Sequence, residues 1–398
     1  MKKIVLTGGG TAGHVTPNIA LFPALKEAGY EISYIGSYAG MEKQLIEEQN
    51  IPYYGISSGK LRRYKDLRNL TDPFRVIKGY AQSVSLLRKI KPDVVFSKGG
   101  FVSVPVVLAA KRLRIPAIIH ESDMTPGLAN KIAIPAACKV CCNFPETVDY
   151  LPKDKAVLTG SPIRQELLSG DKEQAARLCG FTMDKPVILV VGGSSGSKFI
   201  NDAVRGLLDD LLANYQIIHL CGKGNIDKLY NNRSGYIQFE YAGKELRYMF
   251  ALSSLVISRA GANAICELLA LHKPNILIPL SAAASRGDQI LNARSFEKQG
   301  YSYVIEEENL TKETLDAAIK KVMTEKETYI SNMKSSQQLD SIHTILKLIE
   351  EASEKKKKKC KRCKVLILYK TLHLYFYFFF LFYLYHIQNF FHFIIRKL

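Results

Sequence analysis

The sequence predicts an α/β protein built from two Rossmann-like, doubly wound domains that face each other across a cleft. The length of 398 residues is enough for two domains, each with its own core. An apolar strand, a glycine-rich loop and a helix follow one another at residues 4–25, and the same order recurs at 187–212. Ligands of such sheets bind beyond the carboxyl ends of the strands, so both glycine loops should open into one cleft.

The first of these units begins with the apolar strand Ile4–Thr7 and continues into the loop Gly8–His14, whose sequence is GGGTAGH. A helix should follow over 18–29. Glycine lets main-chain amides come close to a phosphate or diphosphate, and the start of a helix attracts that charge. A glycine loop alone is a weak signal. Its order here departs from GxGxxG, which argues against NAD.

Further buried strands are expected in the first half at 32–35, 51–54, 93–97 and 116–120, with a second glycine turn at Lys98–Ser103. Residues 60–65 (KLRRYK) form a basic loop. Between Pro73 and Ile90 a helical pattern places Phe74 and Ile77 on an apolar side, with basic residues among them. Two interpretations stay open for this helix: packing on the sheet, or an amphipathic surface that touches anionic lipid headgroups.

The second half should begin after a linker at 160–185, with the strand 187–191 and the loop 192–197. His219 lies inside a later strand and is expected to be a core histidine. The strand 255–257 ends at Ser258, and a helix carrying Glu267 follows it. That helix would aim its free N–H groups at the cleft, where they suit phosphate. Residues 311–350 should be helical.

The formal charge of +18 is unevenly distributed, because residues 355–398 hold eleven Lys or Arg and no Asp or Glu, which leaves +7 for residues 1–354. A modestly basic body suits an anionic substrate or membrane surface; we see no nucleic-acid-binding motif and expect no nucleic acid. The eight cysteines form no zinc frame, so no metal is expected. The amino terminus lacks a signal-peptide core, which favours a cytoplasmic enzyme.

Residues 355–398 differ from the rest of the chain: five lysines precede a stretch rich in Phe, Tyr, Ile and Leu. One interpretation is a membrane anchor with a polybasic flank. Its uninterrupted apolar core, 374–385, is shorter than the roughly 20 residues of a spanning helix. The other interpretation is a frameshift product, because an adenine tract encodes a lysine run and A/T-rich DNA read in a wrong frame yields this composition.

Residues 1 to about 350 resemble the MurG-type glycosyltransferases. The resemblance is carried by GGGTAGH in the first loop, by the stretch from Glu121 to Asn130, and above all by the SRAGAN…E…SRGDQ..NA string between Ser258 and Ala293. It implies the two-domain GT-B fold, with residues 1–160 facing the acceptor and the membrane and residues 161–350 holding the donor.

The resemblance also implies a reaction. An inverting enzyme without metal or cofactor would move N-acetylglucosamine from UDP-N-acetylglucosamine to the muramoyl-pentapeptide of undecaprenyl diphosphate, which converts lipid I to lipid II. The enzyme would be peripheral, at the cytoplasmic face of the cell membrane and in contact with its anionic surface.

Site roles follow from the matching positions. His14 is the candidate catalytic base, since imidazole titrates near working pH, although it could instead only bind a phosphate. The family has asparagine where this chain has Asp123, which can accept but not donate hydrogen bonds, and glycine where it has Ala12. Glu267 would bind the ribose. The other expected substrate-binding residues are Thr11, Ala12, Gly13, Asp123, Arg164, Ser194, Arg259, Gly261, Ala262, Asn263 and Gln289.

Other functions fit parts of the pattern. A glycolipid glycosyltransferase or a nucleotide-sugar 2-epimerase would share the two domains and the glycine loops. A non-catalytic nucleotide-sugar sensor at the membrane would bind UDP without turnover. The pairing of GGGTAGH with SRAGAN…GDQ favours the muramoyl transferase.

Overall fold

The computed structural model describes residues 1–59, 68–193, 195–282, 287–336 and 338–356. The chain divides into two compact units, Met1–Ile349 and Glu350–Leu398. The basic loop 60–65, Ser194 and the tail from residue 357 lie outside the described residues, so the predictions about them stay predictions. No helix within the described part of the chain is both long and apolar enough to cross a membrane.

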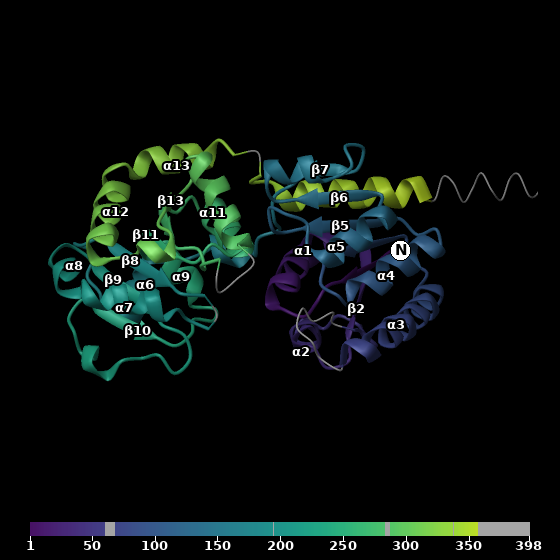
Figure 1. The fold of residues 1–398 in the computed structure, drawn as a ribbon, viewed down its shortest axis with the longest axis horizontal. Coiled ribbons are helices and arrows are strands. Elements are labelled where there is room, and N and C mark those ends of the chain that lie inside the picture. Colours follow the sequence, from purple (N-terminus) through teal and green to yellow (C-terminus); the bar gives the residue numbers. More distant parts are fainter. Residues whose placement is uncertain (60–67, 194, 283–286, 337, 357–398) are drawn as a thin grey trace, which may run out of the picture. The chain divides into compact units, whose positions relative to one another are not determined.

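The first sheet has seven parallel strands in the order β3-β2-β1-β4-β5-β6-β7 (Figure 1). Its strands are β1 (Lys2–Thr7), β2 (Tyr30–Ser37), β3 (Tyr53–Ile56), β4 (Val94–Ser97), β5 (Ala117–Glu121), β6 (Lys139–Cys142) and β7 (Ala156–Leu158). The order reverses between β1 and β4, and Thr7 pairs with Ser97 there. The loops that leave β1 and β4 therefore start side by side, where ligands of such sheets bind.

The helices of this half gather around its sheet, in purple and blue in Figure 1. They are η1 (Ala12–His14), α1 (Thr16–Glu27), α2 (Met41–Glu47), α3 (Arg68–Ile90), α4 (Ser103–Arg112), α5 (Leu128–Ala133), η2 (Ile134–Ala136) and η3 (Pro145–Tyr150). Tyr80, Val84 and Leu87 of α3 pack against the apolar core of the sheet, whereas Phe74 and Ile77 are exposed. The carboxyl-terminal part of α3 therefore packs, as one interpretation predicts, and its first turns leave apolar side chains uncovered.

The second sheet has six parallel strands in the order β10-β9-β8-β11-β12-β13. Its strands are β8 (Val187–Val191), β9 (Gln216–Leu220), β10 (Tyr236–Phe239), β11 (Ser253–Ser258), β12 (Asn275–Leu277) and β13 (Tyr303–Val304). Ser258 pairs with Val191 on one side and with Leu277 on the other. These three strands end together, so the loops that follow them meet at one edge. The prediction of two Rossmann-like, parallel-sheet domains is confirmed.

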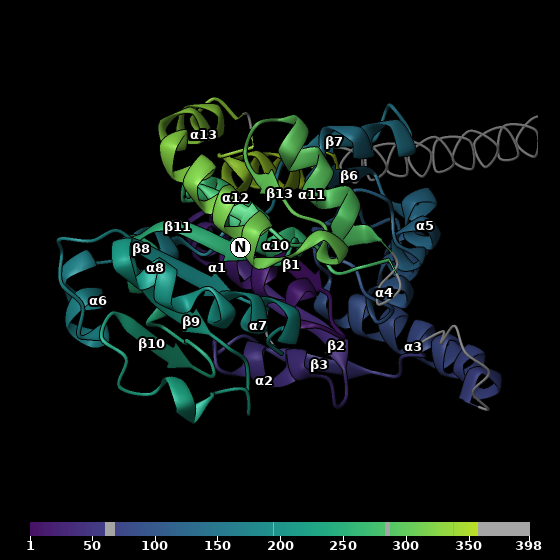
Figure 2. The ribbon, with the colours of Figure 1, turned by 60° about the vertical axis from the view of Figure 1, so that its left-hand side comes forward.

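The helices of the second half surround this sheet, in teal and green in Figure 2. They are η4 (Gln165–Leu168), α6 (Lys172–Cys179), α7 (Lys198–Gly206), α8 (Leu208–Asn214), η5 (Lys228–Tyr230), α9 (Leu246–Leu252), α10 (Ala262–Ala270), α11 (Asp288–Lys298), η6 (Glu307–Asn309), α12 (Lys312–Thr324) and α13 (Lys326–Lys334). His219 lies inside the core, with Tyr236 Oη 2.9 Å from Nδ1 and Asn201 Oδ1 3.0 Å from Nε2. Its prediction as a core histidine is confirmed.

Two sequence predictions in this half need correction. The expected linker 160–185 is too long, because Leu167, Ala175 and Cys179 are buried in the core of the second sheet. Its mixed composition reflects an amphipathic helix, α6, that buries only one side. The helical pattern 311–350 is also divided, into α12, α13 and a helix over 341–356. The breaks fall at Glu325 and at the polar turn that begins at Ser335.

The chain passes between the two halves near Gly160 and again near Gln338. Gly160 has a φ of +70°, and a Cβ there would lie 2.6 Å from the carbonyl oxygen of Gln338. Ser341 Oγ donates a hydrogen bond to the carbonyl of Ser161 at 2.7 Å. The two crossings therefore touch, and glycine at position 160 allows both the turn and the approach. The predicted domain boundary, between residues 160 and 161, lies at this place and remains a proposal.

Candidate active site

The first glycine loop, Gly8–His14, follows β1 and donates a hydrogen bond to a buried carboxylate. Glu42, at the start of α2, is fully buried. It accepts hydrogen bonds from Gly10 N at 3.2 Å and from Ser37 N and Oγ at 3.0 and 2.5 Å. A Cβ on Gly9 would lie 2.6 Å from this carboxylate, so any larger residue there would have to displace it. Sequence reasoning missed Glu42, which looks like any acidic residue of a surface helix.

The second glycine turn, Lys98–Ser103, leaves β4 and contacts the first. Gly99 and Gly100 have φ values of +94° and +84°, which glycine adopts without strain. A Cβ on Gly100 would clash with the carbonyl oxygen of Gly9. The two turns therefore form one layer of main chain above the ends of β1 and β4.

His14 lies at the end of the first loop, where its ring reaches the second. Its Nδ1 is 3.1 Å from the carbonyl oxygen of Lys98. A carbonyl can only accept a hydrogen bond, so Nδ1 carries the proton in this pair and Nε2 of the neutral ring keeps its lone pair. The ring is half-buried. In this tautomer Nε2 is the ring nitrogen that can take a proton.

Lys98 is itself fully buried, which the sequence did not predict. Its Nζ lies 2.8 Å from Nδ1 of His120 and donates to Ser122 Oγ at 2.7 Å. His120 Nε2 in turn lies 2.9 Å from the carbonyl of Gly160, at the first crossing. Burial lowers the pKa of Lys98 to about 8. The same residue thus supports His14 with its main chain and the end of β5 with its side chain.

The amino terminus of α10 faces this layer from the second half. Gly261 is the N-cap of the helix and has no side chain that could cap its first amides. Asn263 Nδ2 donates a hydrogen bond to the carbonyl oxygen of Gly13 at 2.9 Å. The main-chain amides of Gly261, Ala262 and Asn263 therefore lie near the peptide that carries His14. Such amides bind phosphate well.

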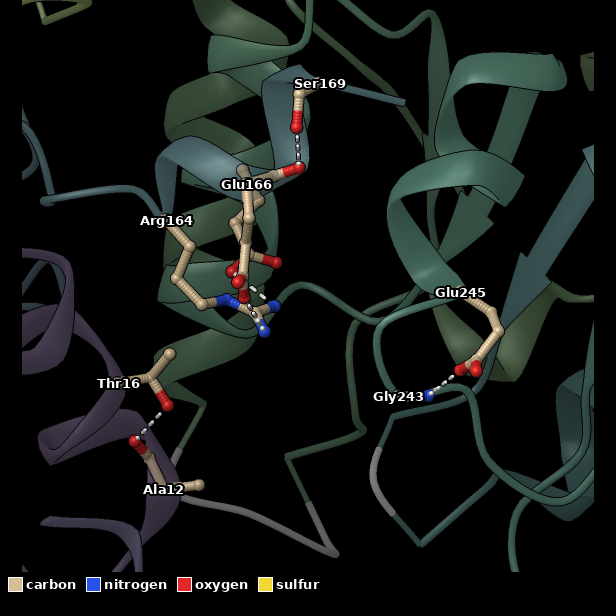
Figure 3. A network of polar contacts seen from close by, with 8 residues as sticks. Ala12, Thr16, Arg164, Glu166, Ser169, Gly243 and Glu245 are labelled. Carbon is tan, nitrogen blue, oxygen red and sulfur yellow. Dashed lines mark hydrogen bonds and ion pairs between the residues drawn. The ribbon is translucent and has the colours of Figure 1, made fainter. Parts of the chain in front are cut away.

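Arg164 and Glu267 come together although 103 residues separate them. Arg164 Nη2 lies 3.4 Å from Oε1 of Glu267, and Nη1 lies 3.6 Å from Oε1 of Glu166. Figure 3 shows the Arg164 side chain running toward Glu166. The Glu267 side chain is 16% exposed, and burial raises its pKa, an effect that Arg164 opposes. A guanidinium beside a carboxylate suits a ligand that carries both phosphate and hydroxyl groups.

Arg259 and Gln289 both bond to the main chain that follows β12. Arg259 forms an ion pair with Glu307 and donates to Ser197 Oγ at 2.6 Å and to the carbonyls of Ile278 and Pro279 at 3.1 and 3.2 Å. Its side chain is 11% exposed. Its guanidinium thus holds the ends of β11 and β12. Gln289 Oε1 accepts from Leu280 N at 3.1 Å.

Asp123 lies where the end of β5 meets α11. Asn292 Nδ2 donates to Asp123 Oδ1 at 3.2 Å, and Asn292 Oδ1 accepts from Met124 N at 3.0 Å. The side chain of Asn292 is fully buried. The carboxylate at position 123 therefore accepts a hydrogen bond from Asn292, a bond that the side-chain oxygen of an asparagine there could also accept.

The remaining loop residues, Thr11 and Ala12, are exposed. Thr16 Oγ1 donates to the carbonyl of Ala12 at 3.0 Å, as Figure 3 shows. The structure thus brings the Gly13–His14 peptide to α10 and Arg164 to Glu267. Ser194 cannot be placed. Within the described ranges no group of three or more His, Cys, Asp or Glu side chains could hold a metal ion.

Comparison with known proteins identifies the family. Residues 4–142 match the glycosyltransferase family 28 N-terminal domain, and residues 187–367 match the glycosyltransferase family 28 C-terminal domain. A protein of Lachnospira eligens is 67% identical over 354 residues, which cover 89% of this chain and 100% of that protein. This chain belongs to glycosyltransferase family 28.

Two relatives within family 28 carry the same name. The Lachnospira eligens protein is a UDP-N-acetylglucosamine–N-acetylmuramyl-(pentapeptide) pyrophosphoryl-undecaprenol N-acetylglucosamine transferase. A protein of Lachnoclostridium phytofermentans with the same name is 66% identical over 351 residues, which cover 88% of this chain and 99% of that protein.

Solved structures agree with the family 28 fold. The crystal structure of Acinetobacter baumannii MurG superposes with a TM-score of 0.71 and 27% identity, over 88% of this chain and 100% of that chain. A UDP-GlcNAc 2-epimerase from Neisseria meningitidis superposes with a TM-score of 0.60 and 15% identity, over 89% and 100% of the two chains. The second likeness shows the fold alone. The fold is GT-B, as predicted.

Proposed function

We propose that this chain transfers N-acetylglucosamine from UDP-N-acetylglucosamine to the muramoyl-pentapeptide sugar of undecaprenyl diphosphate, converting lipid I to lipid II. It is a hexosyltransferase of peptidoglycan synthesis. The observation that carries the proposal is identity of 66–67% to two transferases of that name over nearly their whole length. The 2-epimerase likeness, at 15% identity, offers no comparable support.

The donor is held by the second half in this proposal. The amides at the start of α10 bind the diphosphate, and Arg164 adds a fixed positive charge beside them. Glu267 accepts hydrogen bonds from the ribose hydroxyls. Gln289 donates to the sugar from the first turn of α11. Arg259 is a positioning residue, because its guanidinium is occupied by protein groups.

The chemistry is a single displacement. The acceptor hydroxyl attacks the anomeric carbon of N-acetylglucosamine from the side opposite UDP. The new carbon–oxygen bond forms as the bond to the diphosphate oxygen breaks, which inverts the configuration. His14 Nε2 takes the hydroxyl proton, because Nδ1 is held as a donor by the carbonyl of Lys98. UDP leaves with the electron pair, and the amides at the start of α10 stabilise its charge.

The acceptor reaches the site from a membrane surface. Phe74 and Ile77, in the first turns of α3, are 74% and 65% exposed. Exposed basic residues lie on the same helix, at Arg75 and Lys78. Apolar side chains flanked by cations match the interface of an anionic bilayer. This supports a peripheral enzyme at the cytoplasmic face of the cell membrane. There the enzyme would bind its lipid-linked acceptor.

Phe74→Ala should weaken binding to vesicles that contain anionic lipid by about tenfold, since part of an aromatic side chain is then lost from the bilayer. The measurement is co-sedimentation with phosphatidylglycerol vesicles. Leu229→Ala is the matched control, because Leu229 is 86% exposed on the second half. Equal loss in the two variants would contradict a specific surface at α3.

The function is tested with the full chain, UDP-N-acetylglucosamine labelled in the sugar, and lipid I. Label should enter the lipid fraction in step with UDP release. UDP release without labelled lipid would indicate a hydrolytic or epimerising enzyme. UDP binding without turnover on any lipid acceptor would leave a nucleotide-sugar sensor.

A further inference from the structure

The side chain of Asn263 links the two halves at a place where both carry site residues. Its Nδ2 donates to the carbonyl oxygen of Gly13 at 2.9 Å, although 250 residues separate the two. That carbonyl belongs to the peptide bond between Gly13 and His14. A hydrogen bond to it therefore fixes the main chain from which the His14 side chain departs.

The contact is close enough to restrict the residue at position 13. A Cβ on Gly13 would lie 3.1 Å from Nδ2 of Asn263, which is tighter than most real contacts of this kind. The φ of Gly13 is not in the left-handed region, so the backbone itself admits alanine. The need for glycine at this position comes from the neighbouring amide.

The oxygen of the Asn263 amide is placed differently from its nitrogen. Asn263 Oδ1 is buried and has no hydrogen-bond partner among the described residues. A buried acceptor without a partner costs free energy unless a bound molecule supplies a donor. Asn263 lies in the first turn of α10, where the donor diphosphate binds in the proposed function. The hydroxyl and acetamido N–H groups of a nucleotide sugar are donors of the required kind.

We infer that the side chain of Asn263 is a two-sided positioning residue: Nδ2 fixes the Gly13–His14 peptide, and Oδ1 accepts a hydrogen bond from the bound nucleotide sugar. This role rests on the proposed function and is separate from the main-chain amide of the same residue. It couples donor binding in the second half to the placement of the base in the first.

Two variants of similar size separate the two sides. Asn263→Asp keeps an acceptor and loses the donor to Gly13, but it also adds a negative charge beside the diphosphate, whereas Asn263→Leu loses both amide groups without adding charge. Both should lower kcat about tenfold, because the base is no longer held in place. Asn263→Leu should also raise the KM for UDP-N-acetylglucosamine, by about fivefold. A wild-type KM in Asn263→Leu would overturn the role of Oδ1, and kcat within twofold of wild type in both variants would overturn that of Nδ2.

A double-mutant cycle tests whether the contact itself matters. Gly13→Ala should lower kcat in the wild-type background, since its methyl group displaces the Asn263 amide. In an Asn263→Ala background the same change should cost little, because the amide is gone. Ser295→Ala removes a different hydrogen bond between the halves, to Glu146 at 2.8 Å, and should combine additively with Gly13→Ala. If the effects of Gly13→Ala and Asn263→Ala on kcat were fully additive, the inference would be contradicted.

A readout without catalysis distinguishes failure of this inference from failure of the proposed function. Addition of UDP should slow amide hydrogen exchange in residues 11–15 of the wild-type protein. Asn263→Leu should abolish that slowing while UDP remains bound and Tm changes little. Slowing that persists in Asn263→Leu overturns the coupling, even if the wild-type protein transfers no sugar to lipid I.

Discussion

His14→Ala should lower kcat for transfer to lipid I by a factor of about 10²–10⁴, the usual contribution of a general base. The reason is the geometry of the ring: Nδ1 faces the carbonyl of Lys98 at 3.1 Å, which leaves Nε2 as the proton acceptor. The binding of UDP should hold within about twofold, because the amides of α10 and Arg164 are untouched. Radiolabel in the lipid fraction measures kcat, and titration calorimetry measures UDP affinity.

His14→Gln provides the control for size and hydrogen bonding. Its amide nitrogen can still donate to the carbonyl of Lys98, but it cannot take a proton at working pH. A variant that retains wild-type kcat would show that His14 only binds or positions a phosphate. A loss equal to that of alanine supports the base. If instead UDP affinity falls in parallel with kcat, the histidine acts in donor binding.

Glu267→Ala should weaken UDP-N-acetylglucosamine binding about thirtyfold, which corresponds to about 2 kcal/mol for hydrogen bonds to a charged group. The loss appears in KM, with kcat less affected, because the ribose lies away from the reacting carbon. Removing the carboxylate also leaves Arg164 without its 3.4 Å partner. Glu166→Ala is the matched control: it removes the other partner of Arg164, a carboxylate whose side chain is 56% exposed, and should change KM little.

The pH dependence of donor binding follows from the same residue. Burial raises the pKa of Glu267 above its ordinary value. Glu267 therefore needs a higher pH than an exposed glutamate to become fully ionised, and it becomes protonated at a higher pH as the pH falls. Only the ionised form accepts two hydrogen bonds from hydroxyl groups. Donor affinity should decline on the acid side in the wild-type protein. Glu267→Gln should lack that decline, and a wild-type decline shared by Glu267→Gln would assign it to another group.

The sequence predicts the parts of the site that depend on chain order. Strand, glycine loop and helix appear in the right places because the loops follow directly from buried strands, as at Thr7 and Ser258. The repeat at 4–25 and 187–212 is enough for the two-sheet architecture. Glu267 is a candidate already from its place near the start of a helix that follows a buried strand. Arg164 enters only through the family resemblance, since nothing local marks it.

The parts that the sequence does not predict are contacts between distant side chains. Lys98 reads as an ordinary loop lysine, yet it is buried against His120. Arg259 is predicted to help fix the donor, and nothing in the sequence indicates its ion pair with Glu307, 48 positions later. Such pairings depend on which strands lie next to each other. The order of the strands in the sheet does not appear in the periodicity of the sequence. A single charged residue therefore looks the same in the sequence whether its side chain faces water or a distant partner.

The carboxylate of Glu42 sets a rule about which residues can change together. It occupies the space that a Cβ would need at Gly9 and at Gly40, two positions on separate loops of the chain. Either of these glycines replaced by alanine would have to push the same buried side chain aside. Shortening residue 42 would free both positions at once, but Gly10 and Ser37 would lose their acceptor. These positions therefore behave as one indivisible unit for protein engineering: a library that varies them singly should return glycine each time, and only joint variation with residue 42 can reach a different solution.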